Sequence, residues 1–174
     1  MDAEGYIGEY TQQLDPKGRV VFPVRFRDTM TERERREGFY LTKWLDGSLA
    51  LYPYPEWLRV RAKVQRLGKM DPKYRHFVRT FNSKAREIAL DGQGRIKIPY
   101  VHKEIGSISK EVVFVGMGEY VELWSPEKFN AYEEYHAPDY DKIGEEIFFG
   151  PDEVPVEEGA SESGAAERGD EDSP

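Results

Sequence analysis

The sequence predicts a mainly β protein with short helices (α+β), in which two tandem repeats share one interleaved β-barrel about a pseudo-twofold axis. Two observations lead to this fold class. Two blocks of sequence each occur twice, in the same order and at nearly the same spacing. Each copy also has about four short strands and too few apolar residues for a core of its own, so the copies are expected to share one.

The first repeated block is the longer of the two. Residues 14–23 match residues 90–99 at an offset of 76, with Leu, Asp, Gly, Arg and Pro identical. The second block, residues 49–57, lines up with residues 121–129 at an offset of 72. The difference of four residues indicates one short insertion, most simply within the charged stretch 31–38. Together the two matches indicate a tandem duplication.

Each copy begins with a strand and a tight turn. The strands are expected at residues 6–14 and 84–90, and they lead into the turns Asp-Pro-Lys-Gly and Asp-Gly-Gln-Gly. The Asp side chain can accept backbone N–H bonds at the start of such a turn, and Gly supplies the positive φ at its end. The residues expected to shape the two turns are Asp15, Gly18, Asp91 and Gly94.

The strand after each turn alternates between two faces. Its apolar positions, expected to face the core, are Val20, Phe22, Ile96 and Ile98. The positions between them, which include Arg19 and Arg95, are expected to face outward. Pro23 and Pro99 end these strands, and each can open a short helix at its first turn.

A β-hairpin and a helix complete each copy. In the first copy the hairpin is expected to join residues 39–42 to residues 49–52 through Asp46-Gly47. The hairpin of the second copy is expected to turn at Gly116-Met117-Gly118. Ser125 is the expected N-cap of the helix that closes the second copy. The predicted organisation is a first repeat at residues 6–55, a basic helical linker at 56–82, a second repeat at 83–135 and an acidic tail at 150–174.

Charge is distributed unevenly along the chain. Residues 151–174 hold nine acids and one base, whereas residues 1–150 hold 24 of each. Residues 1–110 alone hold 22 bases and 14 acids, and residues 111–150 hold two bases and ten acids. A basic body favours a polyanionic partner, although a solvated surface explains most such charges. The tail is expected to be disordered and solubilising; a competing interpretation is that it screens the basic body.

Composition excludes several classes of protein and site. The chain has no Cys, so it has no disulfide or thiolate metal site, and this suits the cytoplasm. The longest apolar run has six residues, too short for a membrane span, and the N-terminus does not resemble a signal peptide. His76, His102 and His136 are far apart, and they are expected to be surface histidines rather than metal ligands. No nucleophile or acid–base constellation points to an enzyme, a cofactor or a small-molecule substrate.

Arg19 and Arg95 are the leading candidates for contact with double-stranded DNA. A guanidinium can donate two hydrogen bonds to guanine O6 and N7. In the alternative interpretation, each Arg pairs only with the Asp four residues earlier; the two roles are compatible if Asp orients Arg. Gln93 could bond a base edge or be solvent-exposed. The candidates for phosphate contact, each of which could also be a plain surface charge, are Lys17, Lys97, Arg25, Arg27 and Lys103.

The repeated pattern Leu-Asp-x-x-Gly-Arg-φ-x-φ-Pro, followed by a helix and a hairpin, resembles the SpoVT-AbrB type of DNA-binding unit. Two copies at this spacing, with Gly8-Glu9-Tyr10 and Arg25-Phe26-Arg27, resemble the MraZ family of bacterial transcriptional regulators. His102-Lys103 stand where that family more often has Leu-Arg. The resemblance implies a double-split, swapped-hairpin β-barrel, a nucleoid-associated protein in the cytoplasm, and ring-like homo-oligomers. It also implies binding to short repeated sites in the promoter of the division and cell-wall gene cluster.

Two other classes of function fit the sequence less well. An antitoxin-like interaction module, which binds a toxin through its tail, is expected to have an apolar or amphipathic C-terminal segment. The tail of this chain is instead acidic and rich in small residues. A purely structural assembly protein would not need the paired arginines.

Overall fold

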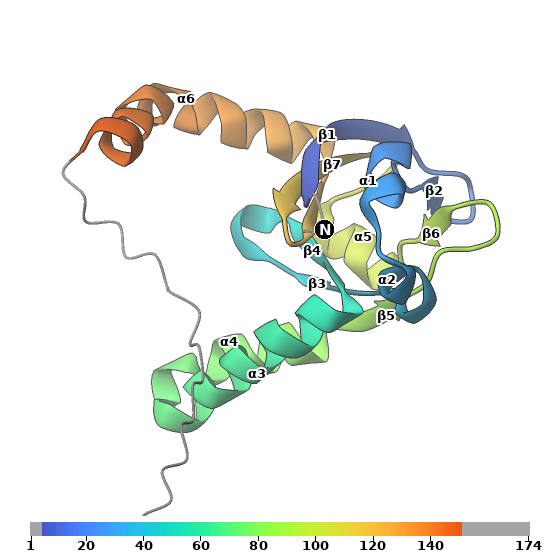
Figure 1. Ribbon diagram of the computed structural model, residues 1–174, viewed down its shortest axis with the longest axis horizontal. Coiled ribbons are helices and arrows are strands. Elements are labelled where there is room, and N and C mark those ends of the chain that lie inside the picture. The colour runs from blue at the N-terminus through green and yellow to red at the C-terminus, as the bar shows by residue number, and fades with distance from the viewer. Residues whose placement is uncertain (1–4, 151–174) are drawn as a thin grey trace, which may run out of the picture. The chain divides into compact units, whose positions relative to one another are not determined.

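The structure of the chain is a computed structural model, and it describes residues 5–150 apart from the side chain of Met70 (Figure 1). The acidic tail expected at residues 150–174 lies, after its first residue, outside the described residues. The chain divides after His136 into two compact units. All the elements described below belong to the first unit, except for the end of the last helix.

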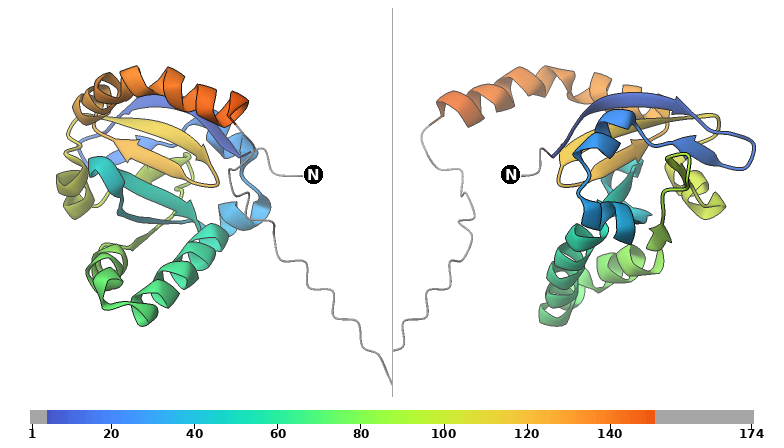
Figure 2. Two further views of the ribbon diagram at one scale, coloured as in Figure 1. Left: turned by 90° about the vertical axis from the view of Figure 1, so that its left-hand side faces the viewer. Right: turned by 45° about the vertical axis from the view of Figure 1, so that its right-hand side comes forward.

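A six-stranded antiparallel sheet is the largest element of the first unit (Figures 1 and 2), with strand order β1-β7-β8-β4-β3-β5. The strands are β1 (Tyr6–Gln13), β3 (Phe39–Lys43), β4 (Leu49–Pro53), β5 (Arg86–Ile88), β7 (Glu111–Gly118) and β8 (Val121–Trp124). β1 of the first repeat pairs with β7 of the second, and β5 of the second repeat pairs with β3 of the first. The two repeats are therefore interleaved.

The strands that follow the two tight turns form a separate antiparallel ribbon. β2 (Arg19–Val21) pairs with β6 (Arg95–Lys97), and Val20 lies opposite Ile96 at the centre. An isolated bridge between Leu14 and Val20 links the ribbon to the end of β1. The tight turns lead the chain out of the main sheet. Within residues 5–150, therefore, no continuous ladder of strand pairs closes into a barrel. The expected closed barrel is therefore not detected, and the strands form a sheet and a ribbon.

Helices connect and cover the strands, so that the expected mixed α+β class is confirmed. The helices are α1 (Val24–Thr29), α2 (Glu32–Glu37), α3 (Tyr54–Met70), α4 (Arg75–Ser83), α5 (Tyr100–Gly106) and α6 (Pro126–Phe149), with short 3-10 turns η1 (Leu45–Gly47) and η2 (Pro72–Tyr74). The insertion expected within residues 31–38 forms α2. Thr31 and Glu34 close its first turn by a reciprocal capping box.

The main core lies between the sheet and the ribbon. Val20, Phe22, Ile96 and Ile98 are all buried in it, as the alternation of the sequence predicted. A second apolar cluster joins the sheet to the helical segment between the repeats. In this cluster the ring of Trp57 on α3 stacks on Phe81 of α4 with centroids 5.1 Å apart. The segment expected to be a linker is thus a helical hairpin packed on the sheet.

Two local predictions were wrong. The hairpin turn is not formed by Gly116-Met117-Gly118 as a unit, because β7 extends through these residues to pair with β1. The turn is centred on Gly118-Glu119, where the Met117 N–H donates to the carbonyl of Tyr120 at 2.9 Å.

His102, expected at the surface, is fully buried because α5 packs on β3. Its Nε2 lies 2.6 Å from the carbonyl oxygen of Lys84. Burial lowers the pKa of the imidazole, which favours the neutral form. The position was mistaken because a single polar residue within a short helix gives no sign of which face is covered.

Candidate functional site

The two tight turns have the same hydrogen-bond pattern. In the first, Oδ1 of Asp15 accepts the backbone N–H groups of Lys17 and Arg19, both at 2.9 Å. In the second, Oδ1 of Asp91 accepts those of Gln93 and Arg95, at 2.9 and 3.0 Å. These contacts are the ones that an Asp at the start of a turn is able to make. The repeated sequence therefore folds into two turns with the same hydrogen-bond geometry.

Each turn also holds its own arginine. Nε of Arg19 donates to Oδ2 of Asp15 at 2.7 Å, and Nε of Arg95 donates to Oδ2 of Asp91 at 2.8 Å. The backbone N–H of each Arg, with its guanidinium, holds the pKa of the paired carboxyl below its usual range. Among residues 5–150, the terminal Nη nitrogens of the two arginines have no hydrogen-bond partner. Each guanidinium is thus fixed at Nε and free at its outer edge.

One face of the ribbon collects the outward positions of β2 and β6. Arg19 lies opposite Lys97, and Val21 lies opposite Arg95. The arginine side chains are 33% and 24% exposed, so they are braced by the turns but open to solvent. Because the ribbon is antiparallel, the two arginines lie at its opposite ends. The ribbon thus presents two equivalent guanidinium groups as hydrogen-bond donors on one surface.

The repeats also support each other's turns. The N–H of Phe22 donates to the carbonyl of Gly94 at 3.0 Å, and the N–H of Ile98 donates to that of Gly18 at 2.9 Å. A Cβ added to Gly94 would collide with the guanidinium of Arg27 from α1. A Cβ added to Gly18 would lie 3.6 Å from Nζ of Lys103 on α5. Gly18 and Gly94 have positive φ, 74° and 71° respectively, a conformation that favours Gly.

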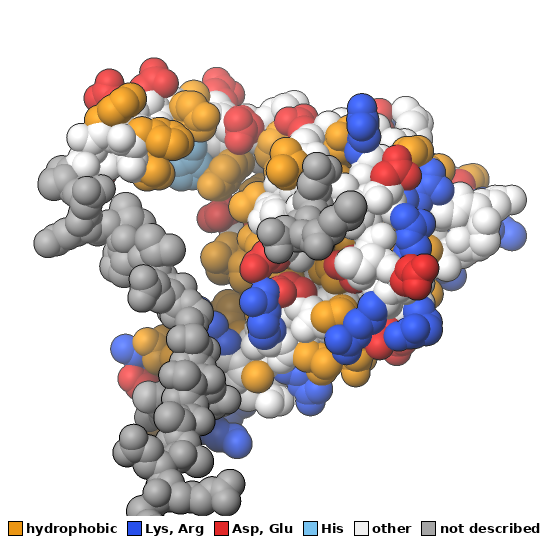
Figure 3. Space-filling view, in the orientation of Figure 1, with side chains coloured by type: hydrophobic (Ala, Val, Ile, Leu, Met, Phe, Trp, Pro, Cys, Tyr) orange, Lys and Arg blue, Asp and Glu red, His pale blue; other side chains and the backbone are white. Residues whose placement is uncertain are grey.

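The candidates for phosphate contact differ in their exposure. Lys17, Arg25 and Lys97 are exposed. Arg27 and Lys103 are half-buried, because each lies against the turn of the opposite repeat. All five are on the ribbon, its turns or the helices that directly follow it. Figure 3 shows Lys and Arg side chains on the right-hand side of the molecule, where the ribbon lies in Figure 1.

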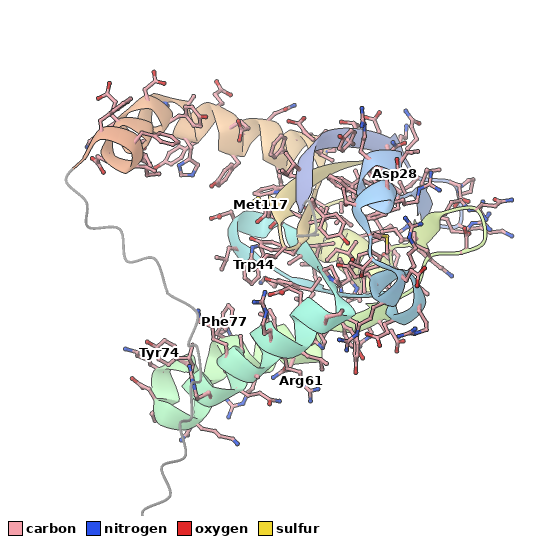
Figure 4. The ribbon with its side chains drawn as sticks, in the orientation of Figure 1. Asp28, Trp44, Arg61, Tyr74, Phe77 and Met117 are labelled. Carbon is pink, nitrogen blue, oxygen red and sulfur yellow. The ribbon has the colours of Figure 1, made fainter. Side chains whose placement is uncertain are left out.

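Other parts of the first unit present different surfaces. Figure 4 places Arg61 on α3 and Phe77 on α4, well away from the ribbon. A cavity of about 320 Å³ is lined by three carboxylates, those of Glu34, Glu56 and Glu119, a charge that disfavours an anionic ligand. Burial and the neighbouring Glu34 raise the pKa of Tyr6 in its wall. The ribbon therefore remains the candidate surface for an anion.

Two features of the site were missed at the level of sequence. Val21 is 39% exposed on the outer face of the ribbon, as the alternation predicted, but it also belongs to the site, at the place where the second repeat has Lys97. The offset of 76 residues relates these two positions, and it also relates Arg27 to Lys103. Comparing every related pair along the repeats could have found Val21. The contact of each helix with the opposite turn could not have been found in that way.

Within the described residues, no group of His, Asp and Glu side chains is arranged to hold a metal ion. Over the same residues, no helix combines the length and apolar character needed to cross a bilayer.

Comparison with known proteins places the chain in a family. The family model described as "MraZ protein, putative antitoxin-like" matches twice, at residues 6–80 and 81–147. A protein from Heliobacterium modesticaldum, named transcriptional regulator MraZ, is 39% identical over 142 residues, 82% of this chain and 96% of that protein. Proteins of the same name from Clostridium acetobutylicum and Clostridium beijerinckii are 39% and 41% identical over the same shares. The chain thus belongs to the MraZ family of transcriptional regulators, a family of regulators and not of enzymes.

Proposed function

We propose that the chain is a sequence-specific regulator that binds double-stranded DNA with the outer face of the β2–β6 ribbon and its two turns. One observation carries the proposal: two arginines, each fixed at Nε by an Asp of its own turn, share one surface, and their Nη atoms have no hydrogen-bond partner among residues 5–150. The family of the chain supports a regulatory role for the protein.

The geometry of the arginines supports a role in base recognition. The Nη nitrogens of Arg19 and Arg95 are proposed to donate to guanine O6 and N7, the commonest specific contact of Arg in the major groove. Asp15 and Asp91 orient the guanidinium groups and shape the turns, together with Gly18 and Gly94. A guanidinium already held by a carboxylate loses less conformational freedom when it binds a base.

The remaining cations of the surface are proposed to contact phosphates, which set the orientation of the protein and contribute affinity without sequence preference. These residues are Lys17, Lys97, Arg25, Arg27 and Lys103. No cofactor, metal or small-molecule substrate is part of the proposal. The site of action is the cytoplasm, at the nucleoid, and the target is a set of short promoter repeats in the division and cell-wall gene cluster, including the protein's own promoter.

An electrophoretic mobility-shift experiment with DNA from upstream of the protein's own gene tests the proposal. A shift that resists competition by random DNA is expected. A shift that random duplex abolishes at equal mass would contradict sequence-specific binding. Scrambling any short repeats in the same fragment provides the matched control.

Lys97→Ala is expected to weaken binding to the specific duplex and to random DNA by the same factor. The reason is that a phosphate contact carries no sequence information. The slope of log K against log salt concentration should flatten by about one unit. Titrations at several salt concentrations measure both quantities. A change in the ratio of specific to random affinity would show that Lys97 reads bases.

Self-association is expected, in line with a ring-like homo-oligomer. One ribbon presents a small surface, and several ribbons on adjacent repeats gain about 10²–10⁴-fold in avidity without new contacts. Light scattering of the full chain at micromolar concentration measures the mass. A strictly monomeric species with full affinity for a multi-repeat promoter would contradict this expectation.

A further inference from the structure

The pseudo-twofold axis of the ribbon relates positions that are chemically unequal. Lys97 on β6 corresponds to Val21 on β2, and Lys17 at the tip of the first turn corresponds to Gln93 at the tip of the second. All four side chains are exposed. The backbone of the ribbon is therefore nearly twofold symmetric, whereas the charge and polarity of its exposed side chains are not.

The cross-strand register sorts these differences between the two ends of the ribbon. Lys97 lies opposite Arg19, and Lys17 is in the same turn as Arg19, so three cations gather at that end. Val21 lies opposite Arg95, and Gln93 is in the turn of Arg95, so this arginine has two neutral neighbours.

Cations on the flanking helices do not remove the difference. α5 brings Lys103 to the Arg19 end, and α1 brings Arg27 to the Arg95 end. Within residues 5–150, the Nε of Arg27 is buried and has no hydrogen-bond partner, and the guanidinium lies against Gly94. Each flanking helix thus sets one cation against a turn, and α1 also carries the exposed Arg25, which corresponds to Val101 on α5. On the ribbon itself, the contrast is between Lys17 and Lys97 at one end and Gln93 and Val21 at the other.

We propose that the ribbon binds DNA in one fixed orientation, with its Arg19 end as a phosphate anchor and its Arg95 end as the wider base reader. This inference rests on the proposed DNA-binding function. At the Arg19 end, Lys17 and Lys97 hold phosphates beside the guanine contact. At the Arg95 end, Val21 and Gln93 read bases beside the guanine contact.

The chemistry of the Arg95 end favours an A·T pair next to the guanine. The amide of Gln can pair with adenine N6 and N7, and an apolar side chain can pack on the C5-methyl group of thymine. Val21 is suited to the methyl group because it is an apolar residue left 39% exposed on a polar face. Exposure of an apolar valine side chain to water is unfavourable, whereas its burial against a methyl group lowers the free energy.

Tethered cleavage tests the orientation. The chain has no Cys, so Pro16→Cys and Gly92→Cys each create a single attachment point for a DNA-cleaving iron chelate. These related positions lie in the first and second turns, and a side chain at Gly92 meets nothing within 4 Å. The DNA is the duplex that the unmodified protein selects from a random pool, and each conjugate must first be shown to retain binding to it.

The two conjugates are expected to cut on opposite sides of every site, each on one side only. Equal cutting on both sides by either conjugate would mean that the ribbon binds in both orientations, which overturns the proposal and leaves DNA binding intact. Failure of the unmodified protein to select any duplex would instead overturn the proposed function.

Thymine-to-uracil replacement tests the role of Val21 without relying on the conjugates. Replacing each thymine of the selected duplex in turn removes one methyl group. At one position next to the Arg95 end, the unmodified protein is expected to lose about fourfold in affinity, the value implied by burial of one methyl-sized group.

Val21→Ala should be insensitive to that replacement. Val24→Ala is the matched control, because Val24 is 57% exposed on α1 and outside the ribbon, and this variant should keep the full loss. Equal sensitivity of Val21→Ala and the unmodified protein at every thymine would remove Val21 from base reading.

Discussion

Arg19→Ala and Arg95→Ala are each expected to weaken binding to the specific duplex by about 1–3 kcal/mol and binding to random DNA only slightly. The reason is that the free Nη edge of each guanidinium is the group proposed to meet guanine, whereas random DNA is held mainly through its phosphates. Titrations with both kinds of DNA measure the two affinities, and Lys97→Ala is the comparison in which both should change alike.

Thermal unfolding of the same preparations separates base reading from a purely structural role. Each Arg also pairs with its Asp at 2.7–2.8 Å, so some loss of stability is expected as well. Arg19→Lys is a useful second variant because it keeps the charge but cannot make a bidentate contact. Arginine variants that unfold earlier but keep the ratio of specific to random affinity would disprove the base-reading role.

Phe22→Ala is expected to lower the free energy of unfolding by about 3–5 kcal/mol, the usual cost of emptying a buried aromatic site. Phe22 is fully buried, and its ring contacts those of Phe26, Phe39 and Phe114 with centroids 5.2–5.9 Å apart. These partners come from both repeats, so the cavity would lie at the junction of the sheet and the ribbon. Urea unfolding, monitored by tryptophan fluorescence, measures the change.

Val21→Ala is the matched control for that experiment. Val21 is the residue before Phe22 and is exposed on the opposite face of β2. It is expected to change stability by less than about 0.5 kcal/mol, as surface substitutions usually do. A similar loss for both variants would mean that the ribbon does not pack on the sheet as described.

Local chemistry made much of the molecule predictable. Asp15 and Asp91 start turns because their carboxylates accept nearby N–H groups, and Gly18 and Gly94 end them because a positive φ favours Gly. These interactions span four residues or fewer, so they can be read from the sequence. The same holds for the alternation that buries Val20 beside the exposed Arg19, and for the duplication that implies an equivalent site in the second repeat.

The pairing of distant segments could not be read in this way. β7 runs through Gly116 and Gly118 because it pairs with β1, a partner more than 100 residues away in the chain. His102 is buried because α5 packs on β3. Within residues 5–150, β1 and β5 are the two edge strands of the sheet and do not pair with each other, so the expected barrel does not close.

By itself, the sequence determined the repeat, the two Asp-locked turns and the arginines that the turns carry, because each depends on contacts between near neighbours. Only the tertiary structure decided that the turns lie at opposite ends of one ribbon, that Arg27 and Lys103 lie against the turn of the other repeat, and that Val21 stands beside Arg95. These relations join residues 67 to 85 positions apart in the chain. Cross-strand hydrogen bonds and shared burial set them, and no local sequence pattern records such contacts.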